Sequence, residues 1–253
     1  MKKDNMQEAR ELWDSIADDW EIQVGDEGDR NRILNSDPVL WEFAGDVKGL
    51  AVLDAGCGTG YLSNKLHEKG ANVIAVDFSK EMIKIAKTKY SQIDFRVDSC
   101  TTLETIDDES IDMVLSNYVF MDSPNLEGAV KSFYRVLKNE GIAVIVFSHP
   151  CFPQGMAKVF GEVDTVEYKW DFSYFEQRKC IDPPWKHFKN QFIWFHRPLS
   201  DYWKAFKSSG FDIVEFEEPR IMEDRYHLIE NNRDPLNSKM RPYSVAFKLR
   251  KRN

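Results

Sequence analysis

The stretch from Leu50 to Gly60, Leu-Ala-Val-Leu-Asp-Ala-Gly-Cys-Gly-Thr-Gly, decides how the rest of the chain is interpreted. Its first four residues are apolar without helical periodicity, which indicates a strand buried on both faces of a parallel sheet and ended by Asp54. The glycines that follow can take positive φ angles and let the backbone approach a ligand closely. The stretch therefore predicts a strand, a ligand-binding turn and a helix that begins near Thr59.

The spacing of the glycines indicates which ligand to expect. The dinucleotide fingerprint G-x-G-x-x-G would need a glycine at position 61, which is Tyr61. Asp54-Ala55-Gly56-Cys57-Gly58-Thr59-Gly60 instead resembles the first motif of class I S-adenosylmethionine-dependent methyltransferases. Phe133-Tyr134-Arg135-Val136-Leu137-Lys138, followed by Gly141, is similar to the R-V-L-K-x-x-G signature that precedes the fifth strand in that family. The structural alternative for the glycines is an ordinary strand-to-helix turn.

The resemblance is to the small-molecule type of these enzymes, similar to the ubiquinone and menaquinone biosynthesis methyltransferases. It implies a doubly wound, Rossmann-like α/β fold with a seven-stranded sheet in the order 3-2-1-4-5-7-6, the last strand antiparallel. The expected organisation is an N-terminal helical lid over residues 1–45, a cofactor-binding core over 46–150, a cap insertion after strand 5 over 151–197, and completion of the core sheet over 198–253.

Two segments are expected to cover the site. A helix from about Met6 to Trp20 carries one apolar stripe, which either packs against the core or closes the site as a lid. Residues 152–195 interleave aromatic and charged side chains, with expected irregular strands over 167–172 and 192–196. These aromatic side chains could line a substrate pocket, pack against one another, or meet a second subunit. The acidic residues among them oppose stacking with single-stranded RNA.

Residues at the carboxyl ends of the strands are the expected cofactor ligands. An acid at the end of the second strand, Asp77, can accept hydrogen bonds from both ribose hydroxyls. The family resemblance implies that an acid and the next backbone amide after the third strand, here Asp98 and Ser99, bind the adenine. Asp98 could instead cap the turn over 101–105. The complete expected cofactor set is Asp54, Gly56, Cys57, Gly58, Asp77, Phe78, Met82, Asp98, Ser99 and Asn117.

The sequence identifies the substrate-binding residues less clearly than the cofactor ligands. Asn117-Tyr118 ends the fourth strand without the Pro-Pro-aromatic motif of amino-group methyltransferases that act on nucleic-acid bases. Tyr118 and Trp20 are the substrate-side candidates. His149, delivered by the fifth strand, could remove a proton from a bound hydroxyl or thiol, or could merely satisfy strand-end backbone groups.

Composition restricts the partners. The 253-residue chain has a net charge of −8, and its basic residues are scattered, which argues against a protein that grips phosphate backbones. Its four cysteines lack C-x-x-C spacing, and no apolar signal or membrane-spanning run is present, so we expect a reduced cytoplasmic protein without disulfides. His67, His187, His196 and His227 show no metal spacing, and no metal site is expected. A monomer or homodimer is expected.

The resemblance implies an enzyme that transfers a methyl group from S-adenosyl-L-methionine to a small-molecule acceptor by in-line displacement, leaving S-adenosyl-L-homocysteine. Two alternatives stay open: an RNA methyltransferase acting on tRNA, and a regulatory protein that binds the cofactor without turnover. The sequence does not choose among O-, N-, S- and C-methylation, because it contains no unmistakable general base.

Overall fold

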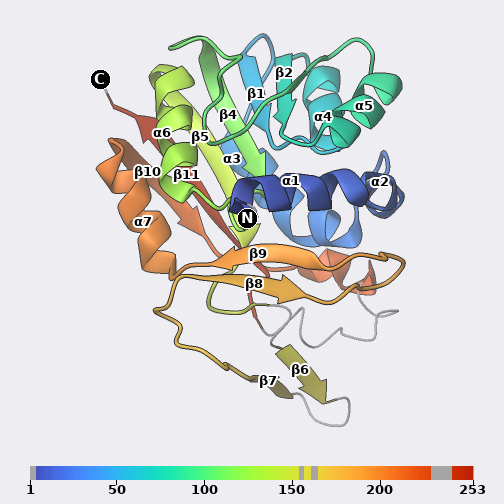
Figure 1. Ribbon diagram of the computed structural model, residues 1–253. Helices are drawn as coiled ribbons and strands as arrows, with labels where there is room; N and C mark the ends of the chain where they lie inside the picture. Colours follow the sequence, from blue (N-terminus) through green and yellow to red (C-terminus); the bar gives the residue numbers. More distant parts are fainter. Residues whose placement is uncertain (1–3, 154–156, 161–164, 229–240, 253) are drawn as a thin grey trace.

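The computed structural model describes residues 4–153, 157–160, 165–228 and 241–252 (Figure 1). Its centre is a seven-stranded sheet in the order β10-β11-β5-β4-β1-β2-β3. The strands are β1 (Ala51–Ala55), β2 (Asn72–Asp77), β3 (Asp94–Val97), β4 (Ile111–Asn117), β5 (Leu137–Ser148), β10 (Phe211–Glu217) and β11 (Ser244–Lys251). Strand β11 runs antiparallel to both its neighbours, and the other neighbours from β5 to β3 pair in parallel. The expected strand order is confirmed.

Each face of the sheet is covered by its own set of helices. One core contains side chains of α6 (Leu126–Val136) and α7 (Leu199–Ser208), and the other those of α3 (Asp37–Ala44), α4 (Tyr61–Glu68) and α5 (Lys80–Lys89). Successive residues of β1 alternate between them, since Val52 belongs to the second core and Leu53 to the first. Both are fully buried, which explains why the strand reads as a continuous apolar run.

The N-terminal segment differs from the single helix that the apolar stripe predicts. It forms α1 (Asn5–Ser15) and α2 (Ala17–Val24), separated at Ile16, whose φ of −112° and ψ of 9° leave the helical region. The break lets both helices contact α5 while Ile16 stays buried. A π-helix, η1 (Arg32–Ser36), follows and was not expected, because no apolar period marks so short an element.

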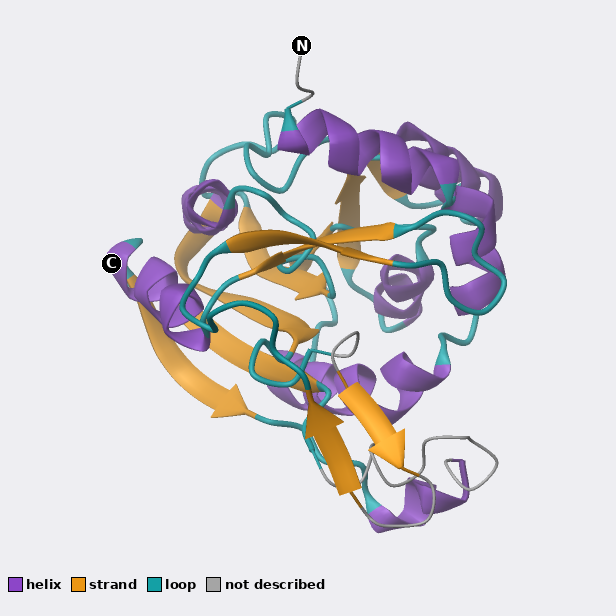
Figure 2. Ribbon diagram, turned by 60° about the horizontal axis from the view of Figure 1, so that its bottom comes forward, coloured by secondary structure: helices purple, strands orange, loops and turns teal. Residues whose placement is uncertain are grey.

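The segment between β5 and α7 forms two hairpins. Strands β6 (Ala157–Phe160) and β7 (Thr165–Tyr168) pair with each other, as do β8 (Arg178–Asp182) and β9 (Phe192–His196). The expected strand over 192–196 is confirmed, whereas the one expected over 167–172 lies mostly beyond the end of β7. Figure 2 shows the β8–β9 hairpin lying in front of the sheet. The Phe195 amide anchors it, donating to the Met121 carbonyl at 2.7 Å.

Candidate functional site

A cavity lies where β1, β2, β3 and β4 end, with α1 and α2 across it. Its empty volume is about 880 Å³, including the part open to solvent, which is within the range of small-molecule sites. The lining includes Trp20, Asp54, Gly56, Cys57, Gly58, Asp77, Phe78, Met82, Ser99, Asn117 and Tyr118. The structure thus brings together every candidate from the sequence except Asp98 and His149.

The glycine turn is tied to the neighbouring strand. The amides of Gly56 and Cys57 both donate to the Val76 carbonyl, at 2.8 and 3.0 Å. Gly56 has φ of +84°, and a Cβ there would lie 2.3 Å from a methyl group of Val119. A Cβ on Gly58 would approach the Trp20 indole nitrogen at 3.4 Å. The need for glycine at position 56 therefore comes from the loop after β4 as well as from backbone conformation.

Asp77 joins the glycine turn to the next helix. Its carboxylate accepts hydrogen bonds from the Gly58 amide and the Ser79 amide, each at 2.9 Å. Burial raises its pKa to about 6, although the two amides oppose this shift. A carboxylate of this kind keeps lone pairs available for donors on a ligand.

The buried carboxyl of Asp54 and the buried thiol of Cys57 also line the cavity. Asp54 accepts a hydrogen bond from the Ser63 hydroxyl at 2.6 Å, and burial raises its pKa to about 7. Burial also raises the pKa of the Cys57 thiol well above its usual value. This thiol is therefore not an activated nucleophile.

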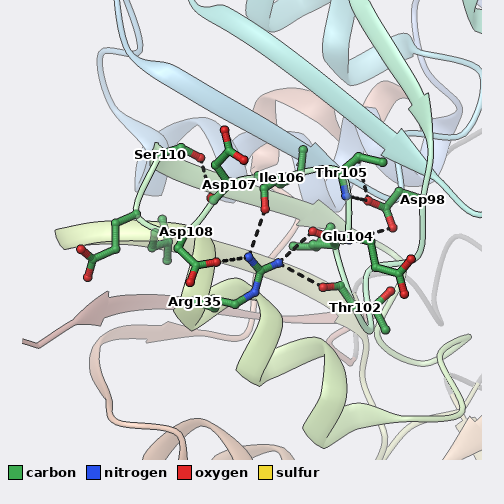
Figure 3. A network of polar contacts seen from close by, with 12 residues as sticks. Asp98, Thr102, Glu104, Thr105, Ile106, Asp107, Asp108, Ser110 and Arg135 are labelled. Carbon is green, nitrogen blue, oxygen red and sulfur yellow. Dashed lines mark hydrogen bonds and ion pairs between the residues drawn. The ribbon is translucent and has the colours of Figure 1, made fainter.

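The structure places Asp98 on its own turn, away from the cavity lining. Its two oxygens accept hydrogen bonds from the amides of Ser99, Glu104 and Thr105 and from the Thr105 hydroxyl, at 2.7–3.2 Å (Figure 3). This is the capping arrangement that the sequence left open as an alternative. Ser99, one residue later, does line the cavity.

Arg135, from the second motif, secures the same loop (Figure 3). Its guanidinium donates to the carbonyls of Thr102, Leu103 and Ile106, and it pairs with Asp108. The motif thus has a structural task, which is to hold the connection between β3 and β4.

Asn117 and Tyr118 leave β4 at the cavity. The Asn117 amide nitrogen donates to the Ser36 hydroxyl at 3.1 Å, whereas its buried oxygen has no hydrogen-bond partner among the described residues. Tyr118 has φ of +59°, and its hydroxyl is hydrogen bonded to that of Ser244. Burial raises the pKa of the Tyr118 phenol, so the phenol stays neutral.

The N-terminal helices supply an aromatic wall. Met6, Trp13, Trp20 and Val24 line the cavity, and the two tryptophan rings meet edge to face at 5.0 Å. A latch holds α1 in place, because the Asp14 carboxylate accepts hydrogen bonds from the Ser79 hydroxyl at 2.7 Å and the Glu81 amide at 3.3 Å. The apolar stripe that the sequence shows therefore faces the cavity.

The structure places His149 outside the cavity lining. Its Nδ1 accepts a hydrogen bond from the Cys151 amide at 3.2 Å, and its Nε2 lies 2.7 Å from a Glu218 oxygen. Burial lowers its pKa, so the ring is neutral with the proton on Nε2. The ring thus serves strand-end groups, as in the alternative interpretation of the sequence.

Two charged residues that line the cavity are absent from the candidates named from the sequence. Arg32 lies on η1, 5.2 Å from the Trp20 ring centre and 5.7 Å from that of Tyr118, and pairs with Asp29 at 3.1 Å. Asp122 lies in the loop after β4. Neither belongs to a motif, and only the position of Asp122 five residues after a strand end could have signalled a role.

In the described part of the chain, no group of three His, Cys, Asp or Glu side chains is placed to hold a metal ion. No helix in those residues has the length and apolar character needed to span a bilayer.

The cavity fits the cofactor that the resemblance implies. A ribose diol needs acceptors, which Asp77 offers, and an ammonium group needs an acceptor such as the unpartnered, buried Asn117 oxygen. The Thr59 hydroxyl is also buried, has no partner in the described part of the chain, and could donate to a carboxylate. Phe78 and Met82 offer apolar surface for a base.

Comparisons with known proteins agree with this fold. Residues 53–145 match the family described as a methyltransferase domain. A malonyl-[acyl-carrier protein] O-methyltransferase of Hamiltonella defensa is 33% identical over 148 residues, covering 58% of this chain and 56% of that protein. A demethylmenaquinone methyltransferase of Lactococcus lactis is 27% identical over 241 residues, covering 86% of this chain and 87% of that protein. The chain thus spans about half of the first relative and most of the second.

The fold also resembles solved structures. An S-adenosylmethionine-dependent methyltransferase from Mesorhizobium loti superposes with a TM-score of 0.71 at 20% identity, covering 85% of this chain and 96% of that one. The family match and the relatives agree with the expected resemblance to methyltransferases, and the solved structure has the same fold.

Proposed function

We propose that this chain, whose core belongs to the class I S-adenosylmethionine-dependent methyltransferases, is an enzyme that methylates a small-molecule acceptor. One observation carries the proposal: the motif turn, Asp77 and the unpartnered Asn117 oxygen all face one cavity at the carboxyl ends of the strands. This is where ligands of open α/β sheets bind.

The residues have separate roles in this proposal. Asp77 accepts hydrogen bonds from the ribose, Phe78 and Met82 flank the adenine, and the Ser99 backbone contacts the ring. Asn117 and Thr59 hold the charged end of the cofactor. When bound, S-adenosylmethionine supplies an electrophilic methyl group on a positively charged sulfur. The chain fixes the geometry of the two reactants and excludes water, which contributes on the order of 7 to 11 kcal/mol in well-oriented reactions.

A small acceptor is favoured because α1 and α2 close one side of the cavity with Met6, Trp13 and Trp20. Helices α1 and α2 then act as the lid, and the β8–β9 hairpin belongs to the cap over the acceptor. We also propose a cytoplasmic protein, monomeric or homodimeric, that does not act on nucleic acid. Association with tRNA that weakens steeply with salt would contradict the last point.

Two measurements test the function. Mass spectrometry of ligands that co-purify with the protein should find S-adenosylmethionine or S-adenosylhomocysteine, and calorimetry should give a single site for either. Turnover is then measured with methyl-labelled cofactor and a library of small alcohols, phenols, amines, thiols and carboxylates. Binding without any labelled product would leave the regulatory alternative.

A further inference from the structure

Asp122 differs from the other carboxyl groups that line the cavity. Asp54 and Asp77 both accept hydrogen bonds from protein donors. The Asp122 carboxyl, by contrast, accepts none from the residues that the structure describes. The residue is half-buried because one side of it faces the cavity. A half-buried carboxyl that faces a cavity and has no donor among the described residues can accept a hydrogen bond from a ligand, which makes it a candidate for a group that acts on a ligand.

The loop that carries Asp122 is fixed on both sides. The amides of Asp122 and Ser123 donate to the Val119 carbonyl, at 2.9 and 3.1 Å. The buried Arg197 guanidinium donates to the Ser123 carbonyl at 2.7 Å. Strand β9 holds the preceding residue through the amide of Phe195, described above. The position of the Asp122 backbone is therefore set before any ligand enters, as a catalytic group requires.

Charges around Asp122 come from several elements. Burial raises its pKa well above the usual value of a carboxyl group, and the charge of Asp182 on β8 raises it further. Arg197 donates to the carbonyls of Phe120 and Ser123 and contacts the Tyr202 phenol, whose pKa is raised by burial. Arg32, in the same cavity, is already paired with Asp29. The environment thus favours a carboxyl that holds a proton strongly.

We propose that Asp122 is the catalytic base that takes the proton from the methyl-accepting atom, which therefore carries a hydrogen as a hydroxyl or amine N–H. The proposal rests on the proposed function. A lone pair of the acceptor oxygen or nitrogen forms the bond to the methyl carbon, while the carbon–sulfur bond breaks with its electron pair left on sulfur. The proton of the acceptor atom passes to the Asp122 carboxylate and leaves to solvent when the cavity opens.

The same geometry argues against a carboxylate acceptor. Such an acceptor has no proton to lose, so the transfer would leave Asp122 without a proton to take. A hydroxyl or amine N–H can donate to the Asp122 carboxylate, which accepts no hydrogen bond from the described residues.

The test compares wild type with Asp122→Asn, which keeps the shape of the side chain, and with Asp182→Asn. In the labelled library, wild type should yield methyl ethers or methylamines. Asp122→Asn should lower kcat/KM roughly 100-fold or more, with S-adenosylhomocysteine affinity unchanged by calorimetry. The rising limb of the kcat/KM pH profile should disappear in Asp122→Asn and move to lower pH in Asp182→Asn.

An infrared readout does not depend on turnover. The difference spectrum between wild type and Asp122→Asn should show a protonated carboxyl band that persists above the pH at which an ordinary carboxyl group ionises, and this band should disappear as the pH rises further. A carboxyl that is already ionised at acidic pH, a methyl ester as the main product, or Asp122→Asn turning over like wild type would each overturn the role of Asp122. If the wild-type protein binds S-adenosylhomocysteine but methylates no acceptor, the proposed function itself is wrong, whatever the infrared result.

Discussion

The two halves of the cavity are built differently. In the half at the ends of β1 and β2, where we propose that the cofactor binds, the buried carboxylates Asp54 and Asp77 are held by donors from the protein. In the half after β4 and beneath α1 and α2, where we propose that the acceptor binds, Asp122 faces the cavity without a donor from the described residues. The carboxylates of the first half are therefore held before a ligand arrives, whereas Asp122 would gain its donor from the acceptor. A motif can describe the first but not the second.

The largest expected effect concerns the glycine turn. Gly56→Ala places a Cβ 2.3 Å from Val119 at a φ of +84°. Backbone strain and overpacking together should lower the free energy of unfolding by about 3 kcal/mol or more, measured by urea denaturation, and abolish detectable cofactor binding. Gly58→Ala is the matched control, because its Cβ would meet only Trp20, at 3.4 Å. Equal losses in both variants would show that the Val119 contact is not the cause.

Variants of Asp77 and Asp98 distinguish a residue that binds the ligand from one that caps a turn. Asp77→Asn should weaken S-adenosylhomocysteine binding by about 1.5 to 3 kcal/mol, the worth of hydrogen bonds to a charged group, as measured by calorimetry. Asp98→Asn should instead lower the free energy of unfolding with little change in affinity, since Asp98 caps its own turn. An affinity loss in Asp98→Asn as large as that in Asp77→Asn would return Asp98 to the adenine site.

Most of the fold follows from the sequence because its signals are local. The β1 run and the motif turn each depend on neighbouring residues, and the strand order follows from the family resemblance. The elements that sequence reasoning placed wrongly depend on distant contacts. Ile16 breaks a periodic helix because both halves pack on α5, and η1 has no period of its own.

The candidate site divides in the same way. Residues predicted at strand ends, such as Asp77 and Asn117, line the same cavity, because strand ends meet at one edge of a parallel sheet. Arg32 and Asp122 were missed because their roles depend on what surrounds them in space. His149 also follows a strand end, but it lies outside the cavity lining, and Glu218 and the Cys151 amide contact its two ring nitrogens.

Cofactor affinity should depend on pH through Asp77. Its pKa in the free protein is about 6, and ribose hydroxyls that donate to the carboxylate favour the ionised form. Binding therefore competes with protonation, and affinity falls as pH drops through 6, at most about tenfold per pH unit. Calorimetry between pH 5 and 8 measures this slope. Asp77→Asn should remove this slope of affinity against pH. Asp54→Asn should instead remove the titration of the Asp54 carboxyl, whose pKa is about 7. A slope that persists in Asp77→Asn would assign it to another group.

The latch between α1 and α5 should have a smaller effect. Asp14→Ala removes the acceptor for the Ser79 hydroxyl and the Glu81 amide, which should weaken the closed position of α1 by about 1 kcal/mol. We expect faster cofactor dissociation by roughly fivefold and faster hydrogen exchange in α1, with the exchange of β4 and β5 unchanged. Glu8→Gln, which alters the ion pair with Lys179 at the other side of α1, is the matched control. If both variants release the cofactor at the wild-type rate, α1 is part of the wall and not a lid.

Replacing His149 should have the smallest effect on turnover, and it tests whether His149 or Asp122 is the base. His149→Gln keeps a donor for Glu218 and loses the acceptor for the Cys151 amide, so the free energy of unfolding should fall by about 1 kcal/mol. Because the ring lies outside the cavity lining and is neutral, kcat/KM and its pH profile should stay at the wild-type level. A loss of turnover together with the rising limb of the profile would make His149 the base. Asp122 would then be only a contact of the acceptor, since one proton leaving one atom needs one base.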